Sequence, residues 1–457
     1  MERNFTKSQF FRLLFLLILS SMLIACGEQS PQSGGGSQSL NRILEKAGVN
    51  QNTYQPVTNP AKVTLGKMLF FDKVLSGNRD ISCATCHHPL MNTVDNVPLS
   101  LGTGNEGLGP TRTLSADRIL IPRNSPELFN RGHPEWETMF WDGRISGNAF
   151  IGFSTPANEQ LLPGLDNILA AQALFPVTSR DEMRGLPGDR DAFGRINEIA
   201  LIDDSDFMGI WSAVFQRIWS IPEYQTLLRQ AYPGVPDNAF SLGHIANAIA
   251  EFEINSFTFF DSPFDRFLAG DQSALSNAAK QGAVLFFEKA GCDTCHSGIL
   301  LTDQQYYNLG VPQLGPGKDF AAPLDWGRLI ETSLAEDKYR FRTPSLRNVA
   351  TTGPYMHNGA YDNLRDAVVH HLNASQMLFS YNGTNLPQMV ASTVKSDMST
   401  ISDVLATLDS YAVTPPVLTE AEIDTLVEFL VALTDLSSLN LIDVVPESVP
   451  SGLPVAD

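Results

Sequence analysis

Apolar residues recur every three or four positions along much of the chain, which is the spacing of one face of an α-helix. Two of these segments repeat each other, since residues 66–73 and 282–289 both follow the pattern G-x-x-L-F-F-acid-Lys. Each half then has a later amphipathic segment, which starts after Ser241 in the first half and after Thr419 in the second. This order predicts a mainly α protein with two domains related by internal duplication.

The periodicity of the two later helices predicts which of their residues are buried. Apolar positions about one turn apart are Leu242, Ile245, Ile249 and Phe252 in the first half, and Ile423, Leu426, Val427, Leu430 and Leu433 in the second. Thr419 and Glu422 have the spacing of a capping box, so we expect the second of these helices to begin there.

The first 25 residues have the pattern of a secretory signal, with Arg3, Lys7 and Arg12 ahead of an apolar run. That run is too short for a permanent membrane span. It ends in LIACG at 23–27, which resembles the lipobox of bacterial lipoproteins. We therefore expect an exported, periplasmic protein that is lipid-anchored through Cys26.

Residues 29–39 are rich in Gly, Ser and Gln, and this composition predicts a flexible tether over 26–45. In lipoproteins an Asp after the acylated cysteine favours the inner membrane, so Gly27 favours the outer membrane. The alternative is an ordinary secreted protein in which Cys26 has no role.

The chain is acidic, with 31 Lys and Arg against 50 Asp and Glu and a net charge of −19. Residues 1–25 carry two more basic than acidic residues, so their removal leaves −21. A surface of this charge argues against nucleic acid as a partner and favours encounter with small basic partners.

Four of the five cysteines occur in two motifs of the form C-x-x-C-H, CATCH at 83–87 and CDTCH at 292–296. This pattern attaches haem c, because two thiols one short turn apart form thioethers and the adjacent imidazole is an axial iron ligand. Two copies that use every cysteine except Cys26 favour haem over disulfides, a redox dithiol or half of a zinc site. The predicted attachment residues are Cys83, Cys86, His87, Cys292, Cys295 and His296.

We therefore expect two covalently bound haem c groups, one in each of two tandem cytochrome c-like domains. The predicted segments are a lipoprotein signal (1–25), a flexible tether (26–45), an N-terminal domain (46–262), a C-terminal domain (263–437) and a C-terminal tail (438–457).

Over nearly all of the mature chain the sequence resembles the bacterial dihaem cytochrome c peroxidases and their relative MauG, the methylamine dehydrogenase maturation enzyme. The resemblance rests on landmarks in the same order and spacing: residues 93–98, FWDGR at 140–144, AQA at 171–173, RTPSLRN at 342–348 and PYMHNG at 354–359. It implies that the N-terminal haem meets hydrogen peroxide and that the C-terminal haem passes electrons. The donor would be a small cytochrome or cupredoxin.

The resemblance also assigns three residues to the peroxide site. Gln172 and Glu182 match the distal Gln and Glu of the family, and Trp141 matches the tryptophan between the two haems. A carboxylate at this place can take a proton from one peroxide oxygen and return it to the other. Taken alone, Glu182 would be a solvated carboxylate beside Arg180 and Arg184, and Trp141 a core aromatic.

Asn124, Thr352 and Pro354 match family positions that hold a calcium ion between the domains. An amide oxygen and two main-chain carbonyls are suitable ligands for this cation. Only the resemblance points to this site, and it also makes a homodimer an expectation.

The chain departs from the peroxidases where they carry a distal histidine on the N-terminal haem. Thr103 stands at that position, and a hydroxyl is a poor iron ligand, so we expect an open, five-coordinate N-terminal iron that needs no reductive activation. The alternative is that His133, in an inserted segment, replaces the missing ligand.

A second departure concerns the C-terminal haem. Fourteen residues after His357, where peroxidases have an axial Met and MauG an axial Tyr, the chain has His371, preceded by His370. This predicts that His296 and His371 hold the second iron, which lowers its potential relative to a His/Met site. His370 and Met356 are the alternative ligands.

Three functions follow from these patterns. The first is a dihaem c-type peroxidase that reduces hydrogen peroxide to water with electrons from a small periplasmic donor. The second is a MauG-like oxidase that uses peroxide-derived high-valent iron on a protein or organic substrate, and both departures favour it. The third is a non-enzymatic dihaem electron carrier with two six-coordinate irons.

Overall fold

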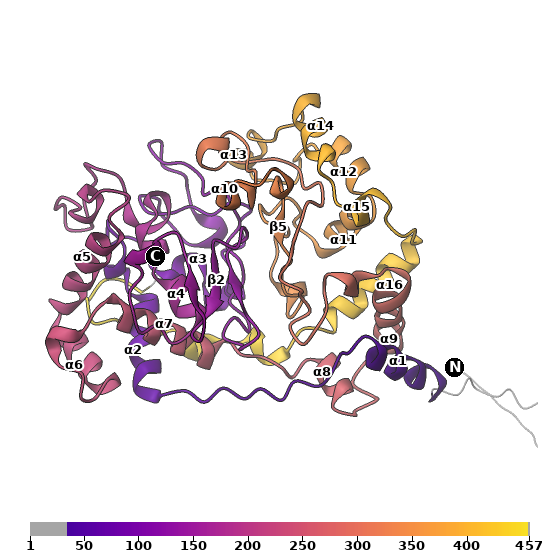
Figure 1. Ribbon diagram of the computed structural model, residues 1–457, viewed down its shortest axis with the longest axis horizontal. Helices are drawn as coiled ribbons and strands as arrows, with labels where there is room; N and C mark the ends of the chain where they lie inside the picture. The colour runs from indigo at the N-terminus through magenta and orange to yellow at the C-terminus, as the bar shows by residue number, and fades with distance from the viewer. Residues whose placement is uncertain (1–33, 456–457) are drawn as a thin grey trace, which may run out of the picture.

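The computed structural model describes residues 34–455, which form two helical halves that lie side by side (Figure 1). The elements of the first half are α2 (Pro60–Phe71), α3 (Cys83–Cys86), β1 (Thr138–Met139), β2 (Ile145–Asn148), β3 (Gly152–Ser154), α4 (Ile168–Ala173), α5 (Phe207–Trp219), α6 (Pro222–Ala231) and α7 (Leu242–Ser256). Within residues 34–455, every helix is too short or too polar to cross a lipid bilayer. The predicted signal and Cys26 lie outside the described residues.

The second half is also mainly helical. Its elements are α8 (Pro263–Leu268), α9 (Asn277–Val284), β4 (Tyr306–Tyr307), α10 (Leu329–Thr332), β5 (Phe341–Arg342), α11 (Leu364–Leu372), α12 (Ala374–Ser380), α13 (Gln388–Ala391), α14 (Met398–Ala406), α15 (Ser410–Val413) and α16 (Glu420–Val431). The strands of the molecule are short, so helix packing supplies both cores.

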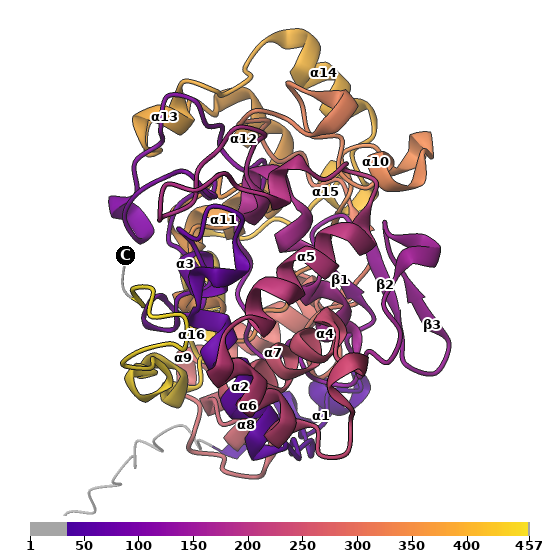
Figure 2. The same ribbon diagram turned by 90° about the vertical axis from the view of Figure 1, so that its left-hand side faces the viewer.

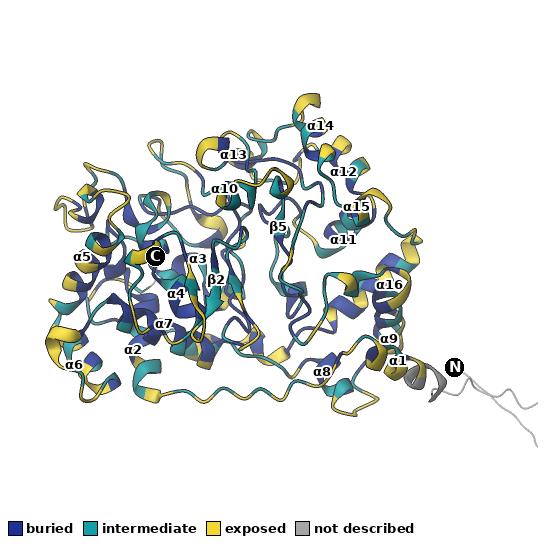
Figure 3. Ribbon diagram, in the orientation of Figure 1, coloured by how far each residue is buried: buried dark blue, intermediate teal, exposed yellow. Residues whose placement is uncertain are grey.

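The first core is built around α2 and α7. Asn59 caps α2 by accepting from the backbone N–H of Ala61, and Pro60 occupies the first turn, where its missing N–H costs nothing. The predicted apolar face of α7 is confirmed, because its four positions are all buried in this core. Figure 3 shows buried residues on α2 and α7, whereas outer turns of α6 and α14 are exposed.

The second core repeats this arrangement with α9 and α16. Thr419 and Glu422 form the predicted capping box, which is therefore confirmed, and Ile423, Leu426 and Leu430 are buried. The segment 282–289, predicted as a single helix, is divided in the structure. The α-helix α9 ends at Val284, and a π-helical turn follows at Leu285–Lys289.

Both halves use the same helix crossing. A Cβ placed on Gly66 of α2 would overlap the backbone of α7 and lie 2.8 Å from Phe252 Cβ. A Cβ placed on Gly282 of α9 would overlap the backbone of α16 and lie 2.8 Å from Phe429 Cβ. The glycine of each repeated segment therefore permits the close approach of two helices.

A three-stranded antiparallel sheet in the order β1-β2-β3 lies at the edge of the first half (Figure 2). Thr138 pairs with Ser146 and Met139 with Ile145. This pairing fixes the strand that leads directly into Phe140 and Trp141.

The two ends of the chain cross over to the opposite halves (Figure 1). Leu40 and Leu44 of α1 (Gly34–Lys46) are buried in the second core, together with Val49. The prediction of a flexible tether is therefore wrong from Gly34 onward, because two leucines one turn apart dock on the second half. Residues 26–33 lie outside the described residues.

The C-terminal segment returns to the first half. Leu441, Val449 and Leu453 are buried in the first core, and Ser451 Oγ donates to Asp72 Oδ1 at 2.6 Å. The main chain itself passes from the first core to the second between α7 and α8. Each terminal segment therefore packs against the half that does not contain its neighbours in sequence.

Candidate functional site

The first C-x-x-C-H motif forms one short helical turn, α3, at the wall of a large cavity. Ser82 and Thr85 make reciprocal capping hydrogen bonds that hold this turn. Among the described residues, none of the four cysteines forms a disulfide. Burial raises the pKa of Cys83 to about 12, which is the opposite of the low pKa that a redox dithiol needs.

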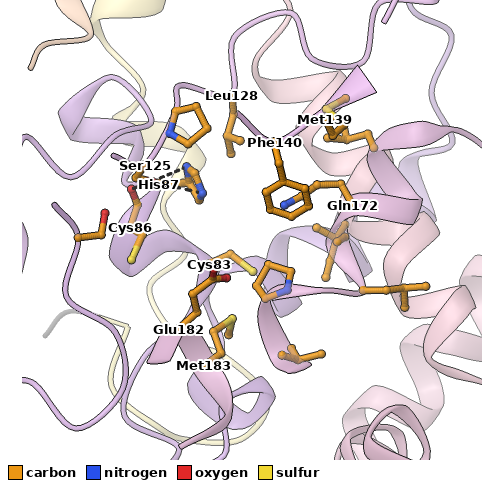
Figure 4. A pocket seen from close by; sticks show the side chains of 18 of the residues that line it. Cys83, Cys86, His87, Ser125, Leu128, Met139, Phe140, Gln172, Glu182 and Met183 are labelled. Atoms are coloured by element: carbon orange, nitrogen blue, oxygen red, sulfur yellow. Dashed lines mark hydrogen bonds between the residues drawn. The ribbon is translucent and has the colours of Figure 1, made fainter. Parts of the chain in front are cut away.

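His87 is held so that its ring faces this cavity. Its Nδ1 lies 3.2 Å from the carbonyl oxygen of Thr93 and 3.2 Å from Ser125 Oγ, as the dashed lines to Ser125 in Figure 4 indicate. Burial lowers the pKa of His87 to about 4, so the imidazole is neutral, as a metal ligand must be. With Nδ1 donating to the carbonyl, Nε2, which lies 3.4 Å from Ser125 Oγ, is the unprotonated nitrogen that would bind an iron.

The cavity has a volume of about 190 Å³, taken as the space open to the centres of water-sized molecules, and its walls are mostly apolar. Cys83, Cys86 and His87 line it on one side, and Phe140 and Gln172 lie across from His87 in Figure 4. Two cysteines outside any disulfide and a neutral imidazole at the wall of one apolar cavity fit a covalently bound haem.

Gln172 and Glu182 come from different elements but line this same cavity. Gln172 lies in the last turn of α4, and Glu182 lies in the π-helical turn Arg180–Arg184. Burial raises the pKa of Glu182, whereas the positive charges of Arg144 and Lys318 lower it. Glu182 is therefore a desolvated carboxyl that can accept and release a proton, and not a solvated surface carboxylate.

The second motif repeats the environment of the first. His296 Nδ1 lies 3.2 Å from the carbonyl oxygen of Leu301. The pKa of His296 is lowered to about 4, mainly because the ring is buried and to a lesser extent because His371 is nearby. Burial also raises the pKa of Cys292 to about 12. A second neutral imidazole and a second pair of cysteines outside any disulfide thus fit a second haem.

The hydrogen bonds distinguish His371 from its neighbour on α11. His371 Nδ1 lies 2.8 Å from the carbonyl oxygen of Ala367, which leaves Nε2 available. Both ring nitrogens of His370 are already used, since Nδ1 lies 2.8 Å from Tyr361 Oη and Nε2 lies 2.8 Å from the Leu309 carbonyl oxygen. Met356 packs in an apolar cluster between the halves.

Comparison with known proteins identifies the family. The model of the family described as di-haem cytochrome c peroxidase matches residues 60–273. The methylamine utilization protein MauG of Methylorubrum extorquens is 32% identical over 325 residues, which cover 70% of this chain and 71% of MauG. The cytochrome c551 peroxidase of Pseudomonas aeruginosa is 34% identical over 317 residues, covering 69% of this chain and 72% of that enzyme.

The chain belongs to the dihaem cytochrome c peroxidase and MauG family of oxidoreductases. The fold agrees with this assignment. A MauG-like protein associated with microbial copper homeostasis superposes with a TM-score of 0.57 at 24% identity, covering 86% of this chain and 94% of that one. The diheme peroxidase BthA of Burkholderia thailandensis gives 0.54 at 21% identity, covering 87% and 90%.

The family's distal histidine has no counterpart at the first cavity. Thr103 is buried away from it, where its Oγ1 donates to Asp80 Oδ1 at 2.7 Å and its backbone N–H donates to the Glu182 carbonyl at 2.7 Å. His133 is also absent from the cavity wall, because its ring packs between Tyr54 and Phe260. Neither side chain is placed to bind an iron held by His87.

Trp141 lies where the two halves meet. Its indole N–H donates to the carbonyl of Asn124 at 2.9 Å, and its own carbonyl accepts from the backbone N–H of Arg342 on β5 at 2.8 Å. The same indole lines the first cavity. Trp141 is thus fixed by hydrogen bonds to both halves.

Asn124, one of the three residues predicted to hold calcium, lies at the same junction. The backbone N–H of Asn124 donates to the His357 carbonyl at 2.8 Å, which places Asn124 beside the loop that contains Thr352 and Pro354. Asn358 Oδ1 in this loop is buried without a hydrogen-bond partner among the described residues. Among those residues no group of three or more His, Cys, Asp and Glu could hold a metal, but a calcium site of amide and carbonyl oxygens is a different donor set.

Several charged residues that line the first cavity were not assigned to it from the sequence, among them Arg144, Lys318 and Glu253. Arg144 stacks on the ring of Phe140 at 3.5 Å and pairs with Asp142 at 2.9 Å. Lys318 comes from the second half, so nothing in the first half could indicate it. Burial raises the pKa of Glu253 on α7 to about 8, and its Oε2 has no partner within the described chain.

Proposed function

We propose that this protein is a dihaem c-type peroxidase that reduces hydrogen peroxide to water with electrons from a small periplasmic donor. The observation that carries the proposal is the cavity that brings His87, Gln172 and Glu182 together. The family membership supports the same reaction class, since both peroxidases and MauG are among the relatives.

Two haem c groups would be held in duplicated domains. Cys83, Cys86 and His87 would hold the first, and Cys292, Cys295, His296 and His371 the second. The matching glycine crossings of α2 on α7 and α9 on α16 support the duplication. When bound, haem supplies an iron that exchanges electrons and reduces peroxide.

The side chains of the first cavity would manage the protons. Reduction of hydrogen peroxide to two water molecules takes two electrons and two protons. Glu182 would accept a proton from one peroxide oxygen and return it to the other as water leaves, for which a carboxyl with a raised pKa is suited. The amide of Gln172 orients the peroxide by hydrogen bonding. Trp141 relays electrons between the halves.

A MauG-like oxidase acting on a protein or organic substrate is the second candidate. It is favoured by Thr103, which stands at the position of the distal histidine of the peroxidases and donates its hydroxyl to Asp80, and by His371 in place of Met or Tyr. Turnover with reduced cytochrome c, compared with turnover of candidate protein or organic substrates, separates the two enzymes.

We also propose that the chain is exported and lipid-anchored at Cys26, on the outer membrane in preference to the inner. Calcium bound by Asn124, Thr352 and Pro354 would hold the halves together, and a homodimer is the proposed assembly. Mass spectrometry of the mature N-terminus tests the lipid anchor, and calcium analysis of the purified protein tests the calcium site.

The decisive experiment is an EPR spectrum of the oxidised holoprotein before and after hydrogen peroxide. A high-spin signal that peroxide abolishes is the expected result, because the first iron would have an open face. Two low-spin signals that do not respond to peroxide would reject both enzymes and leave a dihaem electron carrier.

A further inference from the structure

Beside the predicted ligand His371, the second half contains a buried phenol paired with an imidazole. Tyr361 Oη lies 2.8 Å from His370 Nδ1, and the two rings are 5.2 Å apart between centroids. Both residues are buried. His370 and His371 are neighbours on α11, with ring centroids 6.4 Å apart, so the pair lies beside the residue predicted to bind the second haem iron.

The hydrogen bonds fix the direction in which the phenolic proton can move. His370 Nε2 lies 2.8 Å from the Leu309 carbonyl oxygen, which can only accept, so Nε2 carries the proton of the neutral ring. Nδ1 is therefore an acceptor, and Tyr361 donates to it. A phenol that loses an electron becomes a strong acid, so its oxidation needs a base at this distance.

A route to the surface begins on the other side of Tyr361. The ring of Tyr381 contacts that of Tyr361 edge to face with centroids 5.7 Å apart, and its hydroxyl donates to the Ala360 carbonyl at 2.6 Å. Tyr381 is partly buried, and its neighbours Ser380 and Asn382 are exposed. The aromatic contacts thus run from α11 to solvent.

We propose that Tyr361 is a redox-active tyrosine that supplies an electron to the second haem after peroxide has oxidised the protein. Tyr361 loses one electron to the oxidised second haem, and its phenolic proton passes to His370 Nδ1. The products are a neutral tyrosyl radical and an imidazolium whose Nε2–H still donates to Leu309. A one-electron donor at the surface beside Tyr381 reduces the radical, and the proton returns from His370.

The inference rests on the proposed function, because peroxide supplies the oxidising equivalent. In this scheme the oxidising equivalent from peroxide can also reach an electron donor at the surface of the second half, away from the first cavity. The chemical class of the reductant is a one-electron donor, such as an organic phenol or a small redox protein.

Freeze-quench EPR of the dihaem holoprotein, mixed with hydrogen peroxide in the absence of donor, tests the inference. The expected result is an organic radical signal that narrows when the protein contains ring-deuterated tyrosine. The signal is lost in Tyr361→Phe. It is also lost in His370→Gln, which can accept and donate the same hydrogen bonds but cannot take up the proton.

Tyr411→Phe is the matched control. Tyr411 is another tyrosine close to the second motif, but its hydroxyl donates to the carbonyl of Ala290 at 2.8 Å, and a carbonyl oxygen does not take up the phenolic proton as an imidazole does. The signal is expected to persist in this variant. Tyr307→Phe tests the competing pair in which Tyr307 donates to Asp303 at 2.7 Å.

Two results overturn the inference: a signal that survives Tyr361→Phe, or a wild-type protein that consumes peroxide without any tyrosine radical. Loss of the signal in Tyr307→Phe but not in Tyr361→Phe assigns the radical to the other pair. Peroxide consumption and the optical change of the haems are recorded in the same samples. If the wild-type protein shows neither peroxide consumption nor an optical change of the haems, the proposed function is wrong, and the inference is wrong with it.

Discussion

Burial and nearby cations decide the chemistry of Glu182. The raised pKa means that its proton is lost only at a pH above the ordinary glutamate value of 4.5. Because the deprotonated form is the base, we expect the rate of reaction with peroxide to rise with pH through this displaced midpoint. Glu182→Gln should slow the reaction by about 10²–10⁴-fold and remove this pH limb, as stopped-flow measurements over a pH series will show.

Asp181→Asn provides the control for this prediction. Asp181 is the adjacent carboxyl, and partial desolvation raises its pKa as well. The residue is nevertheless exposed to solvent, and it is not part of the cavity wall. We expect this variant to keep both the rate and the pH limb. An unchanged pH profile in Glu182→Gln would show that another group is the base.

The assignment of His371 rather than His370 as the predicted iron ligand leads to a prediction about the midpoint potential of the second haem. Replacement of His371 by Met should raise the midpoint potential of one haem by roughly a tenth of a volt or more, since axial ligands set haem potentials over a range of about 0.8 V. His370→Gln should leave the ligand set of that haem unchanged, because both its nitrogens are used by Tyr361 and Leu309. Spectroelectrochemical titration measures both. A potential that moves with His370 and not with His371 would reverse the assignment.

Single residues were predictable from the sequence where their chemistry is local. The spacing of Cys83, Cys86 and His87 is enough to indicate haem, because two thiols for the thioether bonds and one imidazole for the iron lie on a single short turn. Lys318 reaches the first cavity from the other half, and no local pattern records that approach. The family resemblance indicated Gln172 and Glu182, whereas their desolvation became visible only in the folded chain.

At the scale of elements, the repeated glycines explain how each half closes. A side chain at Gly66 or Gly282 would meet the backbone of the partner helix, which cannot move aside as a flexible side chain would. We expect Gly66→Ala and Gly282→Ala each to lower the free energy of unfolding by about 1–3 kcal/mol, despite the better helix propensity of alanine. Chemical denaturation of the holoprotein measures the loss.

Gly243→Ala on α7 is the matched control. A Cβ at Gly243 would meet its nearest neighbour, Ser241 Oγ, at 3.4 Å, which is an ordinary contact. We therefore expect this substitution to be neutral or to stabilise the protein by up to about 1 kcal/mol. Equal losses at Gly66 and Gly243 would show that helix crossing is not the reason for the repeated glycine.

The repeated helices could be predicted because periodicity and capping are properties of short segments. Helix α1 could not, because the Gly/Ser-rich composition around it is typical of a tether and its stability comes from docking of Leu40 and Leu44 on the second core. The π-helical turn that carries Glu182 has no simple sequence pattern either. The features that could not be predicted from the sequence are those that depend on contacts between distant segments of the chain.

At the scale of the whole molecule, the crossed termini couple the two halves. Leu40 is fully buried in the second core and Leu453 lies in the first, although each is at the opposite end of the chain from its core. Besides these segments, Arg123 of the first half pairs with Asp325 of the second at 2.7 Å and with Asp142. Damage to one terminus should therefore appear in the distant half.

Leu453→Ala and Leu40→Ala test this coupling. Each should destabilise its core by about 2–5 kcal/mol, the usual cost of truncating a buried leucine. Hydrogen exchange monitored by mass spectrometry should show faster exchange in α2 and α7 for Leu453→Ala, and in α9 and α16 for Leu40→Ala. Val417→Ala, at a side chain 85% exposed, should change exchange in neither pair. If the C-terminal substitution loosened α9 and α16 instead, the terminal segments would be stabilising their own halves, and the crossed arrangement would not account for the coupling.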